Sequence, residues 1–502
     1  MYNKKYNVSF CIYIFFIAFF ISLPAFASET DDTWQKIKAE KFLTWGSDAE
    51  GGAPYCYYDP NKPTELIGFE VDMMKIISKR LGIKDKMIQN DWDTLIPALK
   101  RKSFDIVFSG IEITPSRKQE INFTRPYYVY SQQIVVGVEN TTIHEQKDLK
   151  GHTVGTLSAS AAMKILSDMG LVPGKDLMLY PTVVGAYSDL AIKRTEAVLL
   201  ELPIANFYAK PNKLLKFVGK PFNKGYYGIG VRKEDKVLLS KMNQVISDML
   251  ESGELEKIYK KWNLWTDKQS ELSNFKEDAV EEITKKTFLQ RVPVELPILL
   301  KGALLTVELC FLSMIIAVIL GLSVAIIRMY GPKPLKFIFG TYVEVFRGTP
   351  LLIQLYIIYY GLPEIGIKFN SFSAAIIGLS LNYAAYESEN YRAGIKSIPK
   401  GQMEAALALG MTKPMALRKI IIPQAIKVVI PPVTNDFISM FKDSSIVSTI
   451  GMVELTKNYN YMASVTYDYI GLGLMTAGIY FLMSYPASLF AKSIERRMSN
   501  ER

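Results

Sequence analysis

The chain divides into two parts that differ in their pattern of apolar and polar positions. From about residue 34 to 265, short β-rich runs such as FDIVFSG, QQIVVGV and GHTVGT alternate with helical stretches. VDMMKIISKRLG is one such stretch, with apolar residues at helical spacing. This alternation predicts a soluble α/β domain.

Long apolar segments dominate the C-terminal part instead. Each can supply about 20 residues, enough at about 1.5 Å per residue to span a hydrocarbon core of about 30 Å. They cover roughly residues 297–327, 338–361, 373–393, 426–450 and 469–491. We therefore predict five membrane-spanning helices within an all-α domain at residues 295–494.

The segments at either side of the α/β domain indicate export and attachment. Lys4 and Lys5, an apolar run to Leu23 and Pro-Ala-Phe-Ala before Ser28 predict a signal peptide at residues 1–27. An uncleaved anchor helix is the alternative, and either one exports the α/β domain. Charged residues dominate 266–294, which we interpret as a linker to the membrane.

Basic residues cluster beside the apolar segments, and this clustering predicts an orientation. They follow the first and fifth spans and lie between the third and fourth, so the positive-inside rule places all three groups in the cytoplasm. The same rule explains the net charge of +10 without nucleic acid. We predict a multi-pass protein of the bacterial inner membrane, in contact with lipid, whose α/β domain lies on the periplasmic side.

One polar stretch between the third and fourth spans, EAALALGMTKPMALRKIIIP, has a distinctive spacing. Strong helix formers precede Gly410, which can end a helix, and Lys413-Pro414 can begin another. The positions resemble the EAA motif of ABC importer permeases, with Ile422 where the family has Leu. The matching residues are Glu404, Ala405, Ala406, Gly410, Ile420 and Pro423.

This resemblance implies a permease domain whose cytoplasmic coupling loop, residues 394–425, contacts a separate ATPase subunit. No GxxxxGK[ST] phosphate loop is present in the chain, so we expect no cofactor here and ATP bound by the partner. With one half-pore per chain, we expect a homodimer, or a heterodimer with a second permease. His144 and His152 are the only histidines, and neither a metal site nor a catalytic residue is predicted.

The strings GSDAEGGAPYCYY, IGFEVDMMKIISKRLG and DWDTLIPALKRKSFDIVFSGIEITPSRKQEINFTRPYY resemble polar amino-acid binding proteins of ABC importers. The resemblance implies a two-lobed α/β periplasmic binding protein of type II. Its first lobe would contain residues 34–131 and 224–265, and its second lobe residues 132–223. Together the two resemblances identify a fused receptor and permease subunit for small-molecule amino acids, a transporter rather than an enzyme.

The second resemblance also implies a set of ligand-binding residues. Arg117 matches the arginine that binds the ligand carboxylate in a bidentate, charge-assisted pair. The other matches comprise acids, aromatic residues and possible donors: Asp48, Tyr55, Trp92, Ser109, Gly110, Glu112, Thr114, Thr156, Ser160 and Glu201. Each of Trp92, Arg117 and Glu201 also has a purely structural alternative, as a core, surface or capping residue.

Glu112 departs from the family pattern, because relatives place a small hydroxyl residue there. A third acid favours a cationic amino acid, or replaces the usual ammonium acceptor, so glutamine-like, glutamate-like and basic ligands stay open. The alternative functions from another class are a ligand-gated channel or a sensory receptor that uses the same binding domain. The coupling loop argues against both, and no filter-like TVGYG segment is present in the sequence.

Overall fold

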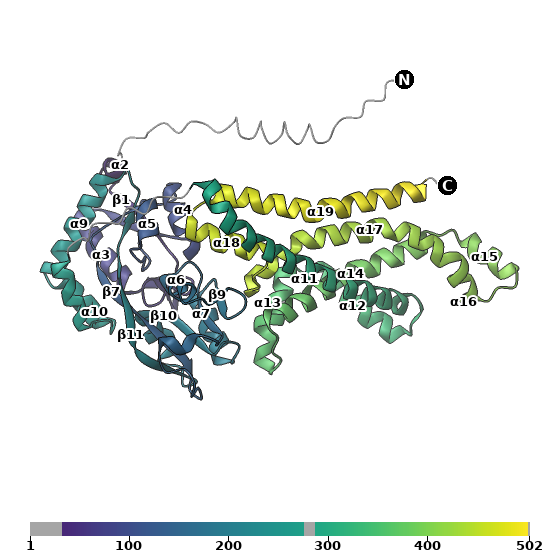
Figure 1. The fold of residues 1–502 in the computed structure, drawn as a ribbon, viewed down its shortest axis with the longest axis horizontal. Helices are drawn as coiled ribbons and strands as arrows, with labels where there is room; N and C mark the ends of the chain where they lie inside the picture. The colour runs from purple at the N-terminus through teal and green to yellow at the C-terminus, as the bar shows by residue number, and fades with distance from the viewer. Residues whose placement is uncertain (1–32, 276–286, 500–502) are drawn as a thin grey trace, which may run out of the picture.

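The computed structural model describes residues 33–275 and 287–499, so the predicted signal peptide lies outside the described residues. Figure 1 shows an α/β domain at one end and a bundle of long helices that extends away from it. We call these parts the receptor domain and the membrane domain. The receptor domain contains two five-stranded sheets, one in each lobe, as the resemblance implied.

Lobe 1 is built on a mixed sheet with the strand order β4-β1-β5-β12-β6. Its strands are β1 (Phe42–Ser47), β4 (Lys84–Gln89), β5 (Ile106–Val107), β6 (Asn122–Phe123) and β12 (Gly230–Val231). A hairpin of β2 (Tyr57–Asp59) and β3 (Lys62–Ile67) stands beside it. Its helices are α2 (Thr33–Glu40), α3 (Phe69–Leu81), α4 (Leu95–Lys100), α5 (Pro115–Glu120), α9 (Lys236–Glu251) and α10 (Glu254–Lys261).

Lobe 2 has the strand order β11-β7-β10-β8-β9. Its strands are β7 (Tyr128–Gly137), β8 (Val154–Leu157), β9 (Leu177–Tyr180), β10 (Ala197–Glu201) and β11 (Leu215–Tyr227). The helices are α6 (Ala161–Asp168), α7 (Val183–Ala191) and α8 (Leu202–Ile204). The chain enters this lobe along β7 and leaves it along β11, which pair antiparallel from Tyr128↔Tyr227 to Gly137↔Leu215.

The segment after α10 was predicted to be a partly helical linker. Residues Asp267–Asn274 form a 3₁₀ helix that packs on β7, where Gln269 exchanges hydrogen bonds with the backbone of Val129 at 2.9 and 2.8 Å. Helix α11 then begins at Phe288, before the expected start of the first span. The predicted linker at 266–294 therefore begins with a short helix packed on the receptor domain and ends with the first turns of α11, and its bounds as a linker stay a prediction.

The membrane domain is helical, but its helices differ from five uniform spans. They are α11 (Phe288–Tyr330), α12 (Lys333–Gly348), α13 (Leu351–Tyr356), α14 (Ser371–Ser397), α15 (Lys400–Ala408), α16 (Lys413–Ala416), α17 (Ile422–Asp443), α18 (Leu455–Thr466) and α19 (Tyr469–Ser499). Among the described residues, two helices, Phe288–Tyr330 and Tyr469–Leu489, are both long and apolar enough to cross a membrane by themselves. Helix α18 was not predicted.

The second predicted span, 338–361, is broken in the structure. Helix α12 ends at Gly348, and Thr349 is extended, with φ −119° and ψ 147°. Pro350 follows it and excludes the helical conformation from the residue before it, so a new helix begins at Leu351. The prediction of one continuous helix was based on apolar composition, which does not take the restriction imposed by proline into account.

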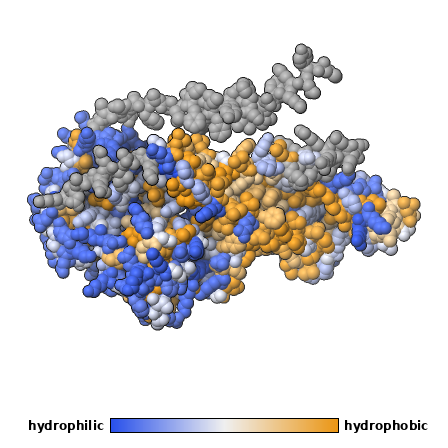
Figure 2. All heavy atoms as spheres, viewed as in Figure 1, coloured by the Kyte–Doolittle hydropathy of each residue, from blue (hydrophilic) through white to orange (hydrophobic). Residues whose placement is uncertain are grey.

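The surface of the molecule agrees with a membrane position for the helical part. Figure 2 shows a hydrophobic surface along the helices, between the hydrophilic receptor domain and a more polar far end. Helix α11 has 43 residues, which at about 1.5 Å each is about twice a hydrocarbon core of about 30 Å. Its length therefore suffices to span the core and continue toward the receptor domain.

Lobe 2 rests on the membrane domain through a buried polar cluster. Asp189 accepts hydrogen bonds at 2.8 Å from Tyr180 of its own lobe and from Tyr359 of the membrane domain. Arg194 pairs with Asp189 at 2.9 Å and lies over the ring of Tyr359, 3.9 Å from its centroid. Lys368 donates to the carbonyl of Ile192 at 3.0 Å. These contacts fix one lobe on the helices.

Glu70, at the start of α3, supports the loop that follows β5. Its carboxyl accepts a hydrogen bond from the Gly110 N–H at 2.7 Å and another from the Tyr127 hydroxyl. The side chain is fully buried, and Oε2 has no hydrogen-bond partner among the described residues. Burial raises the pKa of Glu70 to about 8, so the folded state keeps it protonated at neutral pH.

We expect Glu70→Gln to change the pH dependence of stability. A folded pKa above the unfolded one means that this group's stabilisation is complete below about pH 4.5 and lost as pH rises through about 8. The free energy of unfolding of the variant should equal that of the wild type near pH 5 and exceed it by about 4 kcal/mol near pH 9. Urea unfolding of the full chain in detergent, followed by tryptophan fluorescence, measures this difference.

Tryptophan emission reports the receptor domain alone, because every tryptophan lies within it: Trp34, Trp45, Trp92, Trp262 and Trp265. Asp168→Asn, at an exposed ion pair with Lys164, is the control and should follow the wild type at every pH. If the free energy of unfolding depends on pH in the same way for Glu70→Gln and the wild type, Glu70 is ionised in the folded protein.

Candidate functional site: the cleft between the lobes

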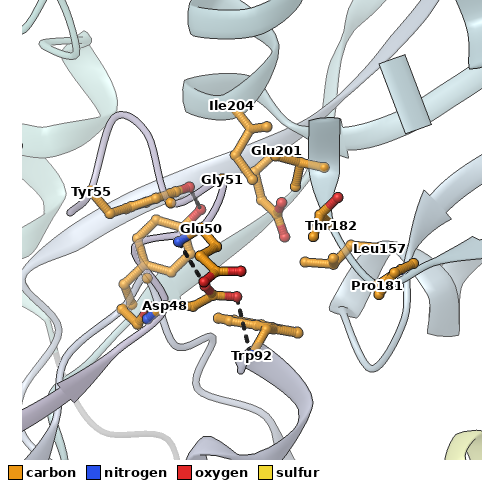
Figure 3. A pocket seen from close by; sticks show the side chains of 15 residues that line it. Asp48, Glu50, Gly51, Tyr55, Trp92, Leu157, Pro181, Thr182, Glu201 and Ile204 are labelled. Carbon is orange, nitrogen blue, oxygen red and sulfur yellow. Dashed lines mark hydrogen bonds between the residues drawn. The ribbon is translucent and has the colours of Figure 1, made fainter. Parts of the chain in front are cut away.

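A narrow cavity of about 40 Å³ lies between the two lobes. Six of the residues predicted to bind ligand line it: Asp48, Tyr55, Trp92, Ser109, Gly110 and Glu201. Figure 3 shows Asp48, Tyr55 and Trp92 on one side and Leu157, Pro181 and Thr182 on the other. The structure therefore brings together residues that are up to 153 positions apart in the chain, from Asp48 to Glu201.

Arg117 lies at the boundary between the lobes and is almost completely buried. Helix α5 positions it, with Thr114 as the N-cap and Pro115 at the first helical position. Its guanidinium donates to the carbonyl of Glu112 at 3.0 Å and, across the cleft, to the carbonyl of Ala159 at 2.9 Å. The arginine thus contacts both lobes at once.

The carboxylate of Glu112 occupies the position that suits a bound anion. It forms an ion pair with Arg117, and its Oε1 accepts a hydrogen bond at 3.0 Å from the N–H of Ala161. Ala161 begins α6, so the carboxylate lies at the positive end of a helix dipole. A residue of the protein itself therefore fills an anion site made by an arginine and a helix N-terminus.

The pKa values of Glu112 and Glu201 shift in opposite directions. Burial alone would raise the pKa of Glu112, but Arg117 and the Ala161 N–H outweigh burial and leave this pKa below its ordinary value. Burial, together with the charge of Glu112, raises the pKa of Glu201 well above its ordinary value. Glu112 is therefore the more readily ionised member of the pair, and Glu201 the more readily protonated one.

The opposite wall is held by backbone and aromatic contacts. Asp48 accepts hydrogen bonds from the N–H groups of Glu50 at 2.9 Å and Trp92 at 3.2 Å. Burial raises the pKa of Asp48, although these hydrogen bonds oppose the shift. The hydroxyl of Tyr55 is 2.8 Å from that of Tyr227. This wall offers an aromatic surface beside a carboxyl group.

Several predicted donors have local structural roles in this conformation. The N–H of Gly110 is bound by Glu70, and the hydroxyl of Thr114 caps α5. Thr156 donates to the carbonyl of Leu199 at 2.8 Å, and Ser160 caps α6. Neither of these two lobe 2 residues lines the cavity, and their direct contact with ligand stays a prediction.

The sequence interpretation missed the backbone partners that lobe 2 provides. Ala159 has a left-handed φ of 59°, and this turns its carbonyl toward Arg117. Ala161 contributes only its N–H, so the identity of its side chain gave no indication of a role in the site. Ser160 before an apolar helical run is an N-cap pattern, and it could have placed the start of α6 in the cleft.

We expect Glu112→Ala to destabilise the receptor domain by about 3 kcal/mol, because it leaves a buried guanidinium without its anion. Urea unfolding of the full chain, followed by tryptophan fluorescence, measures the loss. Glu65→Ala, which breaks an exposed pair with Lys62, is the control and should cost less than about 0.5 kcal/mol. Equal costs for the two variants would contradict a structural role for the Glu112–Arg117 pair.

The second candidate site is the predicted coupling loop, which Figure 1 shows at the opposite end of the molecule from the receptor domain. Helix α15 ends before Gly410, which adopts a left-handed φ of 80°, and α16 begins at Lys413. This helix, bend and second helix were predicted. Glu404 is exposed, and 84% of Leu409 is accessible, so the loop presents both charged and apolar groups to a partner.

Comparison with known proteins gives a family for each domain. Residues 43–264 match the model of the bacterial extracellular solute-binding proteins, family 3. Residues 317–500 match that of the binding-protein-dependent transport system inner membrane component. Among solved structures, an amino acid ABC transporter protein with histidines is 43% identical, with a TM-score of 0.41, and covers 42% of this chain and 99% of that one.

Two curated relatives align with the membrane domain, both from Bacillus subtilis (strain 168). The L-cystine transport system permease protein TcyB is 42% identical over 203 residues, which are 40% of this chain and 87% of the relative. The arginine transport system permease protein ArtQ is 36% identical over 207 residues, 41% of this chain and 94% of the relative. The chain therefore belongs to the binding-protein-dependent transport system inner membrane component family, and it carries a family 3 solute-binding domain in the same polypeptide.

Proposed function

We propose that this protein is the receptor and permease subunit of an ABC importer for polar amino acids. The joined family matches support this proposal, as do permease relatives named for cystine, arginine and glutamine transport. The receptor domain binds the amino acid, and the membrane domain provides half of a translocation path. ATP is hydrolysed by a separate subunit, so the chain itself is a transporter component and not an enzyme.

The Arg117–Glu112 pair is the observation that supports an amino acid most directly. A zwitterion can insert between these two side chains, with its carboxylate on Arg117 and its ammonium group on Glu112. Both charges that separate then regain an opposite partner. The carboxylate would also receive the helix dipole of α6 that now acts on Glu112.

The charged residues of the site also bear on which amino-acid side chain it accepts. Asp48 and Glu201 line the cavity, and Glu112 forms the buried ion pair with Arg117 at the boundary between the lobes. Beyond the ammonium acceptor, the remaining acids could pair with a second positive charge, which favours a basic ligand. The raised pKa of Glu201 favours its protonated form, which can donate to a neutral amide, so a glutamine-like ligand also fits.

The receptor domain and the coupling loop lie at opposite ends of the molecule, and this separation suggests a membrane topology and an assembly. With the receptor domain outside the cell, the coupling loop lies in the cytoplasm, where an ATPase subunit would bind its exposed residues. Two membrane domains, from a homodimer or from a pair with a second permease, would enclose the path. A channel or sensory receptor is not favoured, because neither needs a helix-bend-helix loop of this kind at the cytoplasmic end.

Calorimetry of the full chain in lipid nanodiscs with each of the twenty amino acids tests the ligand. We expect binding of a polar amino acid that weakens at least about 100-fold in Arg117→Ala, because a buried charge-assisted pair is lost. Arg80→Ala, at a surface pair with Glu254, is the matched control and should bind normally.

The calorimetric result also identifies the ligand class. Binding of arginine, lysine or histidine alone would establish a cationic pocket, whereas binding of glutamine or glutamate would establish the other class. If none of the twenty binds, or if Arg117→Ala binds as the wild type does, the amino-acid assignment is wrong.

The coupling loop is tested by separating binding from transport. We expect Glu404→Lys to abolish uptake of the radiolabelled ligand in cells that contain the partner ATPase, while calorimetric affinity stays unchanged, because Glu404 is exposed and far from the cleft. Gln402→Lys on the same helix introduces the same positive group and should retain most of the uptake. Normal uptake by Glu404→Lys would remove this loop as the ATPase contact.

A further inference from the structure

A second cavity, of about 780 Å³, lies between lobe 2 and the helices of the membrane domain. Lobe 2 contributes the end of α6 and the loop that leads to β9, and the membrane domain contributes parts of α11, α14 and α18. Figure 1 shows this region, where β9 faces the bundle. The cavity shares no lining residue with the amino-acid cleft. Its volume lies within the range of about 300–1,000 Å³ that is usual for ligand sites.

The charged side chains that line this cavity are basic. Lys175 of lobe 2 and Lys301 of α11 line it, and both are exposed. None of the described residues that line it is acidic. The acids closest to Lys175 in the sequence of lobe 2 are already bound, since Asp168 pairs with Lys164 at 2.8 Å and Asp176 accepts a hydrogen bond from a backbone N–H of its own loop. The cavity therefore offers an anion two ammonium groups, one from each domain.

Uncharged polar groups of the same cavity also suit an anion. The Oγ of Ser167 is buried and has no hydrogen-bond partner among the described residues. Asn370 and Ser371 lie at the N-terminus of α14, a helix of 27 residues, where the helix dipole favours negative charge. A phosphate group, whose oxygens accept hydrogen bonds and carry negative charge, fits these donors.

The position of Lys301 along α11 places the cavity at the level of lipid headgroups. Lys301 and Arg328 are 27 positions apart, and Glu308 is the only charged residue between them in the sequence. At about 1.5 Å per residue this stretch is about 40 Å long. A bilayer with its headgroup regions is about 40–45 Å thick. With Arg328 at one surface of the membrane, Lys301 therefore lies at the other, on the side of the receptor domain.

Apolar side chains extend from this level toward the middle of the membrane. Ile298, Leu305 and Phe372 line the cavity together with the polar groups. Leu300 and Leu304, beside Lys301 on α11, are 51% and 71% accessible. Acyl chains can cover this apolar surface, while lysine side chains of such a position extend their ammonium groups to the headgroups.

We propose that this cavity binds an anionic phospholipid from the leaflet on the side of the receptor domain, with its phosphate between Lys175 and Lys301. A lipid is favoured over free phosphate because the apolar side chains adjoin the two lysines on the membrane side. One lysine belongs to each domain, so the bound lipid connects the receptor domain with the membrane domain. The inference depends on the membrane position of the helices and not on the amino-acid site.

Native mass spectrometry of the full chain in detergent, titrated with dioleoylphosphatidylglycerol, tests this site. We expect the combined change Lys175→Gln and Lys301→Gln to weaken the binding of one phosphatidylglycerol about 30-fold, the factor for two lysines that each attract an anionic lipid. Glutamine keeps most of the side-chain length and removes only the charge. Each single change should weaken this binding about fivefold.

Two variants and a second lipid are the controls. Lys150→Gln removes the charge of an exposed lysine of lobe 2 that does not line the cavity, and it should bind as the wild type does. Arginine at both positions, Lys175→Arg with Lys301→Arg, keeps the charges and should retain most of the binding. Dioleoylphosphatidylcholine has no net charge, so its weaker binding should be the same in all variants.

Three results would overturn the proposal. The first is equal affinity of the wild type for phosphatidylglycerol and phosphatidylcholine. The second is equal loss of phosphatidylglycerol in Lys150→Gln and in the combined glutamine variant, or no loss in either. The third is displacement of the bound phosphatidylglycerol by an excess of inorganic phosphate, which would identify a site for free anions instead of a lipid site.

Discussion

The guanidinium of Arg117, buried between two lobes, is the constraint around which the receptor domain is organised. An unpaired charge in such a place would cost several kcal/mol, roughly 3–5 on removal of one partner. The fold therefore pairs it with Glu112 and with the carbonyl of Ala159. Because these partners come from lobe 1 and lobe 2, one charge connects the two lobes across the cleft.

In this arrangement a side chain of the protein occupies the anion site of the cleft. Glu112 holds the place of a ligand carboxylate, between Arg117 and the N-terminus of α6, so closure does not leave the anion site without an anion. In the proposed binding mode a zwitterion would replace this internal pair by two new ones, so the charges in the site would stay balanced.

The membrane domain contacts each lobe of the receptor domain separately. Helix α11 continues beyond a single membrane thickness, and its Arg291 pairs with Asp468, next to Tyr467, whose side chain packs on a lobe 1 cluster. Lobe 2 is held separately, through Asp189, Arg194 and Tyr359. Each lobe thus has its own contact with the helices, so a relative motion of the lobes can be transmitted to the membrane domain, whose coupling loop lies at its far end.

Local patterns determined the α/β and all-α character of the two domains, their order, and the α3 and coupling-loop helices, because periodicity, caps and motif spacing are local properties. The two-lobed fold and the candidate acids Asp48, Glu112 and Glu201 were implied by the family resemblance. Local patterns did not determine the break at Thr349–Pro350, the helix α18 or the packing of Gln269 on β7, where single residues within a longer pattern decide. Only the tertiary structure revealed that Glu112 neutralises Arg117 and that the carbonyl of Ala159 binds it from the other lobe. The second contact joins positions 42 residues apart, and a spacing along the chain carries no information about which buried charge will meet which partner.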